Sequence, residues 1–380
     1  MGQRSILSNL TSPKILSSIA TVIIIVIFIP KTSKKSHQIE DYLVYLRKKS
    51  QPYEFAKQIY KNCQNLNPSN RSFSESDYAL FNPLFKNRRD FLFNIRVNRW
   101  FNLTLDQNQK HVLSCIPPKS GTSNWQTAMM RLIKIDKQME ASDNFNTTFE
   151  NYKFNDNFYK LLPRVSKIHF ENNYFDFKFM NSRHPLTRLV SAYHSKFEIH
   201  GQQKNLKRSS NYFLTDYYPI IMSRYEQEKN LRQFDKMYVS FQAFIDFITL
   251  ENCKNKDDLV SKCDAHWIPY SFYCQPCVQK YDAITTVENS RDDSIAVVEQ
   301  LLPRRIRSDQ SRLLKFLNNF VDKILPTSYN NKKSRNRKDF RYLKEHYFDL
   351  LTRDQKQRLL RLYYWDFELF SYDYEYLLGF

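Results

Sequence analysis

Side chains that could bind an anion are concentrated in residues 116–124, whose sequence is IPPKSGTSN. Lys119 supplies a positive charge, and Ser120, Thr122 and Ser123 place hydroxyl donors beside it. A lysine surrounded by short donors is suited to a small anion such as a phosphate or a sulfate. The segment lacks the Gly-Lys-Ser/Thr ending of a Walker A loop, and an ordinary connection with an exposed lysine is the alternative interpretation.

The flanking residues indicate which elements position this loop. Residues 111–115 (HVLSC) form a short apolar run of the kind expected for a buried strand. Apolar side chains recur at helical spacing in residues 125–135, and we expect Ser123 or Asn124 to cap that helix. The start of a helix has unpaired N–H groups and the positive end of the helix dipole. The predicted strand, loop and helix therefore favour an anion in the loop.

A second unit of the same kind follows along the chain. Residues 175–180 (FDFKFM) alternate aromatic and polar side chains and predict a strand, whereas residues 186–197 (LTRLVSAYHSKF) predict a helix that begins behind a proline. Arg183 lies at the end of the strand, and Arg188 and Ser191 lie on the helix. Taken alone, this segment is also compatible with a surface helix that carries exposed arginines.

The two segments together resemble a known pair of motifs. PKSGTSNW (residues 118–125) and SRHPLTRLVSAYHSKF (182–197) resemble the signatures with which Golgi carbohydrate sulfotransferases bind PAPS, 3′-phosphoadenosine-5′-phosphosulfate. The resemblance is to the branch containing the chondroitin/dermatan 4-O-sulfotransferases and the HNK-1 sulfotransferase. It extends to DAHW (264–267), CQPC (274–277), YDAI (281–284), Glu288 and DFELF (366–370). Three positions depart from the family pattern: Thr122 replaces a usual Cys, Ser123 a usual Thr, and His184 a frequent Asp or Glu.

This resemblance implies a donor site built from both units. It implies that the first loop holds the 5′-phosphosulfate and the second holds the 3′-phosphate, with Lys119, Arg183 and Ser191 as the principal contacts. The implied cofactor-binding residues are Pro118, Lys119, Ser120, Gly121, Thr122, Ser123, Asn124, Arg183, His184, Pro185, Leu186, Thr187, Arg188, Leu189, Val190 and Ser191. The resemblance also implies that no metal is required. The implied fold is α/β, an open parallel sheet of the P-loop nucleotide-kinase kind that is flanked by helices.

Transfer of a sulfuryl group to a sugar hydroxyl needs charge neutralisation and a base. We expect Lys119 to stabilise the oxygen of the departing phosphate. His266 is the first candidate for the general base, because it lies in the HW block. A histidine that only orients or packs beside Trp267 is an equally weighted alternative, and His169 and Glu288 are weaker candidates for the base.

The composition favours an anionic partner, because the chain carries a net charge of +19. Its 25 Tyr and 30 Phe exclude a disordered basic tail. The resemblance, together with this charge, implies a carbohydrate sulfotransferase that acts on an acidic glycan or glycoprotein and not on nucleic acid. The expected acceptor is a GalNAc 4-hydroxyl of chondroitin/dermatan or a terminal sugar of a glycoprotein glycan. The alternatives are a P-loop-type kinase and a non-catalytic basic membrane protein that binds polyanions.

The start of the chain indicates a membrane anchor. Residues 15–29 (ILSSIATVIIIVIFI) are apolar and uncharged, although an average membrane-spanning helix needs about 20 residues. A cleaved signal peptide is the alternative, but no small-x-small cleavage site follows. We expect a single-pass type II Golgi protein with a cytoplasmic tail (1–14), a transmembrane signal anchor (15–29), a lumenal stem (30–105) and a catalytic domain (106–380). Sequons for N-glycosylation occur at Asn70, Asn102 and Asn146.

The six cysteines allow two interpretations. Cys263, His266, Cys274 and Cys277 have a zinc-like spacing. The oxidising lumen of the secretory pathway favours disulfides instead. Cys253 with Cys263, and Cys274 with either Cys277 or a more distant cysteine, are the pairings that we expect in that case. A basic segment, KKSRNRKDFR, follows at residues 332–341, either as a solvated loop or as a rim that attracts an acidic glycan.

Overall fold

A four-stranded sheet lies at the centre of the computed structural model. The residues that it describes are 51–65, 99–105, 108–141, 174–198, 213–225, 239–254, 262–302, 307–308, 313, 317 and 340–379. The strands are β1 (Arg99–Leu105), β2 (Asn108–Cys115), β3 (Phe177–Ser182) and β4 (Ala283–Thr286), in the order β1-β2-β3-β4. Strands β2, β3 and β4 are parallel, which confirms an open parallel sheet for these three.

Strand β1 corrects the expected topology at one edge of the sheet. It pairs antiparallel with β2, with Arg99 opposite Ser114 and Leu105 opposite Asn108, so a wholly parallel sheet is wrong. Residues 106–107 alone separate the two strands in sequence. A link this short can join only antiparallel neighbours, because a parallel pair needs a crossover connection.

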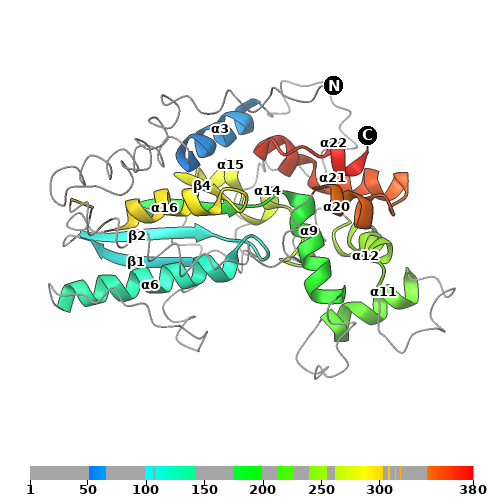
Figure 1. Cartoon of the computed structure of the whole chain (residues 1–380), viewed down its shortest axis with the longest axis horizontal. Coiled ribbons are helices and arrows are strands. Elements are labelled where there is room, and N and C mark those ends of the chain that lie inside the picture. The colour runs from blue at the N-terminus through cyan, green and yellow to red at the C-terminus, as the bar shows by residue number, and fades with distance from the viewer. Residues whose placement is uncertain are drawn as a thin grey trace, which may run out of the picture.

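Helices flank the sheet. The helical elements are α3 (Pro52–Asn65), α6 (Thr122–Ala141), α9 (Pro185–Tyr193), η4 (His194–Glu198), η6 (Phe213–Tyr217), α11 (Tyr218–Arg224), α12 (Phe241–Phe247), η8 (Ile248–Asn252), α14 (Tyr270–Tyr273), α15 (Pro276–Gln279), α16 (Ser290–Leu301), α20 (Phe340–Leu343), η10 (Lys344–Phe348), α21 (Arg353–Phe370) and α22 (Glu375–Leu378). Helix α6 packs against β1, and α3 and α16 pack against β4. Figure 1 shows α6 and α3 on opposite sides of the sheet. Helix α21 packs against α9, α12 and α14 beside it.

The parallel strands are apolar at successive positions because they are covered on both faces. Val112, Leu113 and Cys115 of β2 are fully buried, as are Phe179 and Met180 of β3. This burial explains why residues 111–115 read as a continuous apolar run. The carboxyl ends of β2 and β3 lie at the same edge of the sheet, so the two connections that follow them emerge side by side.

Three disulfides cross-link the described domain, and two of them join parts of the chain that are distant in sequence. The pairs are Cys63–Cys277, Cys115–Cys274 and Cys253–Cys263. The expected Cys253–Cys263 pairing and the distant partner of Cys274 are confirmed. The pairing of Cys274 with Cys277 and the zinc interpretation are wrong, because no cysteine thiol remains free.

Residues from the range assigned to the stem take part in the fold. The Asn62 side chain of α3 donates to the Leu369 carbonyl of α21 at 2.9 Å, and the Tyr53 hydroxyl donates to the Ala296 carbonyl of α16 at 3.1 Å. Strand β1 also lies in this range. The described domain therefore includes residues on both sides of the expected boundary at 105/106.

Several expectations concern residues outside the described ranges. These are the anchor at 15–29, the sequons at Asn70 and Asn146, the weaker base candidate His169, and residues 332–339 of the basic segment. Within the ranges described above, no helix combines the length and the apolar character that a membrane crossing requires.

Candidate functional site: two adjoining corners and a histidine–aspartate pair

The first corner is the tight turn from β2 to α6. Lys119 and Gly121 both adopt the left-handed conformation, with φ of 70° and 77°. The hydroxyls of Ser120 and Thr122 donate to the Pro117 carbonyl at 2.5 and 2.7 Å. These hydroxyls close the turn onto itself, which corrects the expectation that they are free to donate to an anion.

Helix α6 begins at Thr122, so the expected cap at Ser123 or Asn124 is wrong. Both residues lie in the first helical turn, because the positive φ of Gly121 turns the chain into the helix before them. The Trp125 N–H donates to the Gly121 carbonyl at 3.1 Å. The amides of residues 122–124 thus precede the first intrahelical bond, in the position from which helix N-termini bind anions.

Gly121 provides a test of how tightly this corner is built. A Cβ at this position would lie 3.3 Å from Nδ2 of Asn181, at a φ that disfavours any L side chain. Gly121→Ala is expected to lower the free energy of unfolding by about 1–2 kcal/mol for the backbone alone, with more lost to the contact. Gly379→Ala is the matched control, because φ is 68° there and the added Cβ meets only the flexible end of Lys356 at 3.8 Å. Equal losses in urea unfolding would contradict a close-packed corner.

The second corner, from β3 to α9, contacts the first one directly. The Asn181 side chain donates to the Ser120 carbonyl. Arg183 donates from Nη1 to the Lys119 carbonyl at 3.0 Å and from Nε to the Thr187 hydroxyl at 3.0 Å. The two corners that sequence motifs placed 64 residues apart are therefore adjacent in the fold.

The Lys119 ammonium group lies within electrostatic range of two further cations, Lys196 and Arg183. Burial, together with the nearby charges of Lys196 and Arg183, lowers the pKa of Lys119 to about 8. Burial also lowers the pKa of the Arg183 guanidinium, an effect that the Glu288 carboxylate opposes. An anion bound between the corners would relieve this repulsion, because opposite charge favours the protonated lysine.

The Arg188 side chain is buried, whereas the sequence predicted that it contacts a ligand. It is 1% exposed, and its guanidinium lies 4.5 Å from the centre of the Tyr270 ring. It donates to the carbonyls of Pro118 at 3.1 Å, Ile268 at 2.7 Å and Ala265 at 2.8 Å. All three of its nitrogens bind main chain, so Arg188 links the first corner to residues 264–268.

The remaining residues of the second motif fall into two groups. Pro185, Leu186, Thr187, Leu189 and Val190 are buried and hold α9 against the core, whereas Ser191 is partly exposed.

His184 lies between the second corner and the C-terminal residues. Its N–H donates to Glu288 at 3.0 Å, and its Nε2 donates to the Asp373 carbonyl at 2.6 Å. Burial lowers the pKa of His184 to about 4. The imidazole is therefore neutral near pH 7, and the residue contributes a structural contact between α9 and the end of the chain.

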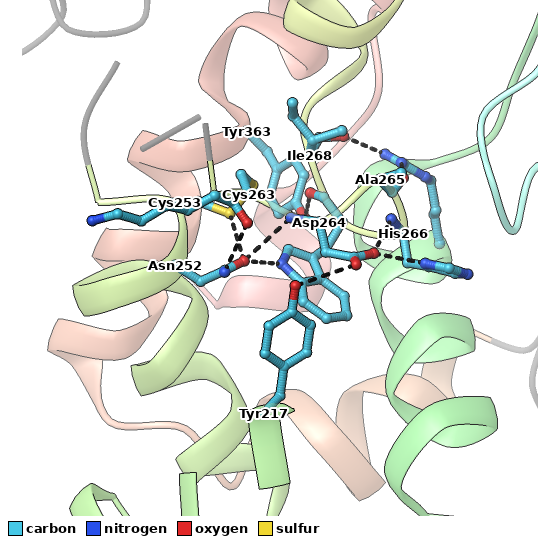
Figure 2. Close-up of a disulfide and its surroundings, with 12 residues drawn as sticks. Tyr217, Asn252, Cys253, Cys263, Asp264, Ala265, His266, Ile268 and Tyr363 are labelled. Atoms are coloured by element: carbon cyan, nitrogen blue, oxygen red, sulfur yellow. Dashed lines mark hydrogen bonds and ion pairs between the residues drawn. A yellow bond between two sulfur atoms is a disulfide. The ribbon is translucent and has the colours of Figure 1, made fainter. Parts of the chain in front are cut away.

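His266 forms a pair with Asp264, which Figure 2 shows between Tyr217 and His266. The His266 Nδ1 lies 2.7 Å from the Asp264 carboxylate, and the Tyr217 hydroxyl donates to the other oxygen at 3.4 Å. Since a carboxylate accepts, Nδ1 carries the proton and Nε2 carries the lone pair in neutral His266. Burial lowers the pKa of His266, Asp264 opposes that shift, and Lys196 and Lys119 add to it.

A buried polar network fixes the loop that carries this pair. The Asn252 side-chain oxygen accepts from the Trp267 indole at 2.8 Å and from the Asp264 N–H at 3.3 Å. The Cys253–Cys263 disulfide holds the same loop (Figure 2). Sequence reasoning selected His266 but missed Asp264 as its partner, although an acidic residue two positions before a histidine was a visible signal.

Lys196 is the second residue that the sequence reasoning missed. It lies in η4, directly after α9, and its charge acts on both Lys119 and His266. Its position in the second motif was visible, but its proximity to the first motif depends on the tertiary fold.

The geometry defines the class of protein, an α/β protein with adjoining strand-to-helix corners at the carboxyl edge of a parallel sheet. The chain belongs to the sulfotransferase family, whose model matches residues 102–373. That range includes both corners and the His266–Asp264 pair, so the family resemblance of the motifs is confirmed.

The chain is also similar to individual carbohydrate sulfotransferases. It is 27% identical to carbohydrate sulfotransferase 14 of Danio rerio over 53% of this chain and 49% of that protein. It is 25% identical to carbohydrate sulfotransferase 10 of Xenopus laevis over 70% and 66%, and 23% identical to carbohydrate sulfotransferase 12 of Mus musculus over 72% and 61%. The chain thus spans about half to two thirds of the length of these curated relatives. No solved structure matches it.

Proposed function

We propose that this chain transfers a sulfuryl group from PAPS to a hydroxyl of a glycan. The observation that carries the proposal is the 3.0 Å hydrogen bond from Arg183 to the Lys119 carbonyl, which joins the two cationic corners. One nucleotide with phosphate groups at both ends can contact both corners at once. Membership of the sulfotransferase family and similarity to proteins named carbohydrate sulfotransferases support the same reaction.

Each corner has its own part in binding the donor. Lys119 and the amides of residues 122–124 bind the 5′-phosphosulfate, because a helix N-terminus and an ammonium group both favour anions. Arg183 and Ser191 bind the 3′-phosphate. The other residues of the two motifs, Arg188 among them, position these groups through the core and through main-chain contacts.

The chemistry then follows from the charges at the site. The bond from sulfur to the bridging oxygen of the donor breaks, and the electron pair stays on the phosphate oxygen, where Lys119 stabilises it. The acceptor hydroxyl oxygen forms the new bond to sulfur and gives its proton to Nε2 of His266. Asp264 holds the imidazole in the tautomer that can accept this proton. The products are a sulfated glycan and 3′-phosphoadenosine-5′-phosphate (PAP).

The acceptor and the cellular location belong to the same proposal. The acceptor is a GalNAc 4-hydroxyl of chondroitin/dermatan or a terminal sugar of a glycoprotein glycan, and the net charge of +19 favours such an acidic substrate. Residues 15–29 anchor the chain in the Golgi membrane with the catalytic domain in the lumen. The three disulfides support an oxidising compartment.

The pH dependence of the rate tests His266 as the base. A base must be unprotonated, and burial lowers the His266 pKa below its ordinary value of 6.5. The rate is therefore expected to hold as the pH falls to about 6.5 and to decline only at more acid pH. Asp264→Asn removes the charge that raises this pKa, so the acid limb should move to still lower pH while kcat falls about 100-fold. If the acid limb of the pH–rate profile lies at the same pH in Asp264→Asn as in the wild type, the pairing of His266 with Asp264 is contradicted.

Sulfate transfer by the full-length chain in detergent tests the function as a whole. The chain is incubated with labelled PAPS and with desulfated chondroitin, desulfated dermatan or an HNK-1 precursor glycan, and label in the glycan is measured. The expected result is PAPS-dependent transfer to one of these acceptors. Thermal stabilisation by ATP but not by PAP would favour the kinase alternative. Salt-sensitive heparin binding with no labelled product would favour a polyanion-binding protein.

A further inference from the structure

Lys196 lies beside the proposed base. Its Nζ is 4.4 Å from the centre of the Phe213 ring. The His266 ring lies 5.1 Å from the same Phe213 ring, at an interplanar angle of 84°. One aromatic side chain therefore contacts both the ammonium group and the imidazole. The charge of Lys196 also lowers the pKa of Lys119, which places Lys196 within electrostatic range of the first corner.

Neither Lys119 nor Lys196 forms an ion pair with a carboxylate among the described residues. The ion pairs of that part of the chain include neither ammonium group. Asp264 is the carboxylate that acts on Lys196, but its oxygens already bind His266 and Tyr217. Burial lowers the pKa of both lysines. Two neighbouring, half-buried cations are unfavourable unless an anion lies between them.

We propose that Lys196 is a further catalytic residue, which binds the non-bridging oxygens of the sulfuryl group as it moves from donor to acceptor. This inference rests on the proposed function. Lys119 is assigned to the departing phosphate and His266 to the incoming hydroxyl. In an in-line transfer the sulfuryl group is the one that lies between those two partners, and Lys196 acts on the residues at both ends.

The role of Lys196 adds no step to the reaction. The bond from sulfur to the donor phosphate oxygen breaks, the bond to the acceptor oxygen forms, and the proton passes to His266. Lys196 keeps its own proton throughout and stabilises the negative charge that the sulfuryl oxygens share in the transition state.

Lys196→Met tests this role, because methionine keeps an apolar stem against Phe213 and removes the charge. The expected result is a fall in kcat of about 100-fold, with little change in the KM for the acceptor or in the affinity for PAP, which has no sulfuryl group. Lys110→Met is the matched control. Lys110 lies 5.3 Å from the Phe177 ring and has a pKa lowered by burial, but it is at the opposite end of β2 from the first corner.

Three outcomes would overturn the inference. An unchanged kcat removes Lys196 from the reaction. Weaker binding of PAP assigns it to the donor phosphates. A raised KM confined to acidic acceptors, with neutral ones unaffected, assigns it to an acid group of the acceptor. If the wild-type chain itself shows no PAPS-dependent transfer, the proposed function fails, and that result is distinct from all three.

Discussion

Lys119→Ala is expected to reduce sulfate transfer from PAPS by about 1000-fold while the chain stays folded. The substitution removes the charge that stabilises the departing phosphate oxygen. It does not remove the bond between the corners, because Arg183 donates to the main-chain carbonyl of Lys119. Alanine also meets the same backbone cost as lysine at φ 70°, since both side chains have a Cβ. The variant therefore tests the contribution of the Lys119 charge without disturbing the hydrogen bond that joins the two corners.

The measurement compares transfer of labelled sulfate with the thermal unfolding midpoint. Lys119→Arg keeps a positive charge and should retain part of the activity, whereas Lys110→Ala should retain nearly all of it. Transfer within tenfold of wild type would remove the first corner from the donor site. A large fall in the unfolding midpoint would instead assign Lys119 a structural role.

Arg188→Met is expected to destabilise the fold by about 3–5 kcal/mol, because it removes the partner of buried polar groups. The guanidinium is 1% exposed and satisfies the carbonyls of Pro118, Ala265 and Ile268. Methionine fills much of the space above Tyr270, but it leaves all three acceptors without a donor. The first corner would also lose its link to the loop that carries His266.

Urea unfolding of both proteins measures this loss. Arg361→Met is the control, because Arg361 is an exposed residue of α21 and its replacement should change stability by less than about 0.5 kcal/mol. If Arg188→Met unfolds like wild type but loses PAP binding, Arg188 contacts the donor and its structural assignment is wrong.

Local pattern was sufficient to predict the two corners. An apolar run, a proline- and glycine-containing break and an amphipathic segment specify strand, turn and helix within one short stretch of chain. The structure has β2 and α6 at the first corner and β3 and α9 at the second. The positions of Lys119 and Arg183 at these strand ends follow directly from the sequence.

The contacts that each polar side chain makes could not be predicted from local sequence pattern. Arg183 and Arg188 have the same chemistry. Arg183 connects the two corners through a hydrogen bond to the Lys119 carbonyl, whereas Arg188 is fully buried and donates to main-chain carbonyls. Ser120 and Thr122 were suitable anion donors by type, but the Pro117 carbonyl takes both hydroxyls. The hydrogen-bond partner of each side chain depends on which acceptor groups the tertiary fold brings close to it.

Long-range partners were hidden for the same reason. Cys115–Cys274 and Cys63–Cys277 join residues 159 and 214 positions apart, and no local pattern selects one distant cysteine over another. The Cys253–Cys263 pair spans only 10 positions and was an expected pairing, but sequence proximity alone is no guide, because Cys274 and Cys277 are nearer still and do not pair. Strand β1 was assigned to the stem because its role depends on pairing with β2.

The Cys63–Cys277 bond also decides how this domain responds to a mechanical pull. A force applied before α3 enters that helix, which the Cys63–Cys277 bond joins covalently to residue 277. Residues 64–276 form a loop that this bond bypasses, and both corners and His266 lie within that loop. The shortest covalent path from α3 to residue 277 therefore runs through this disulfide and not through the catalytic machinery or β1.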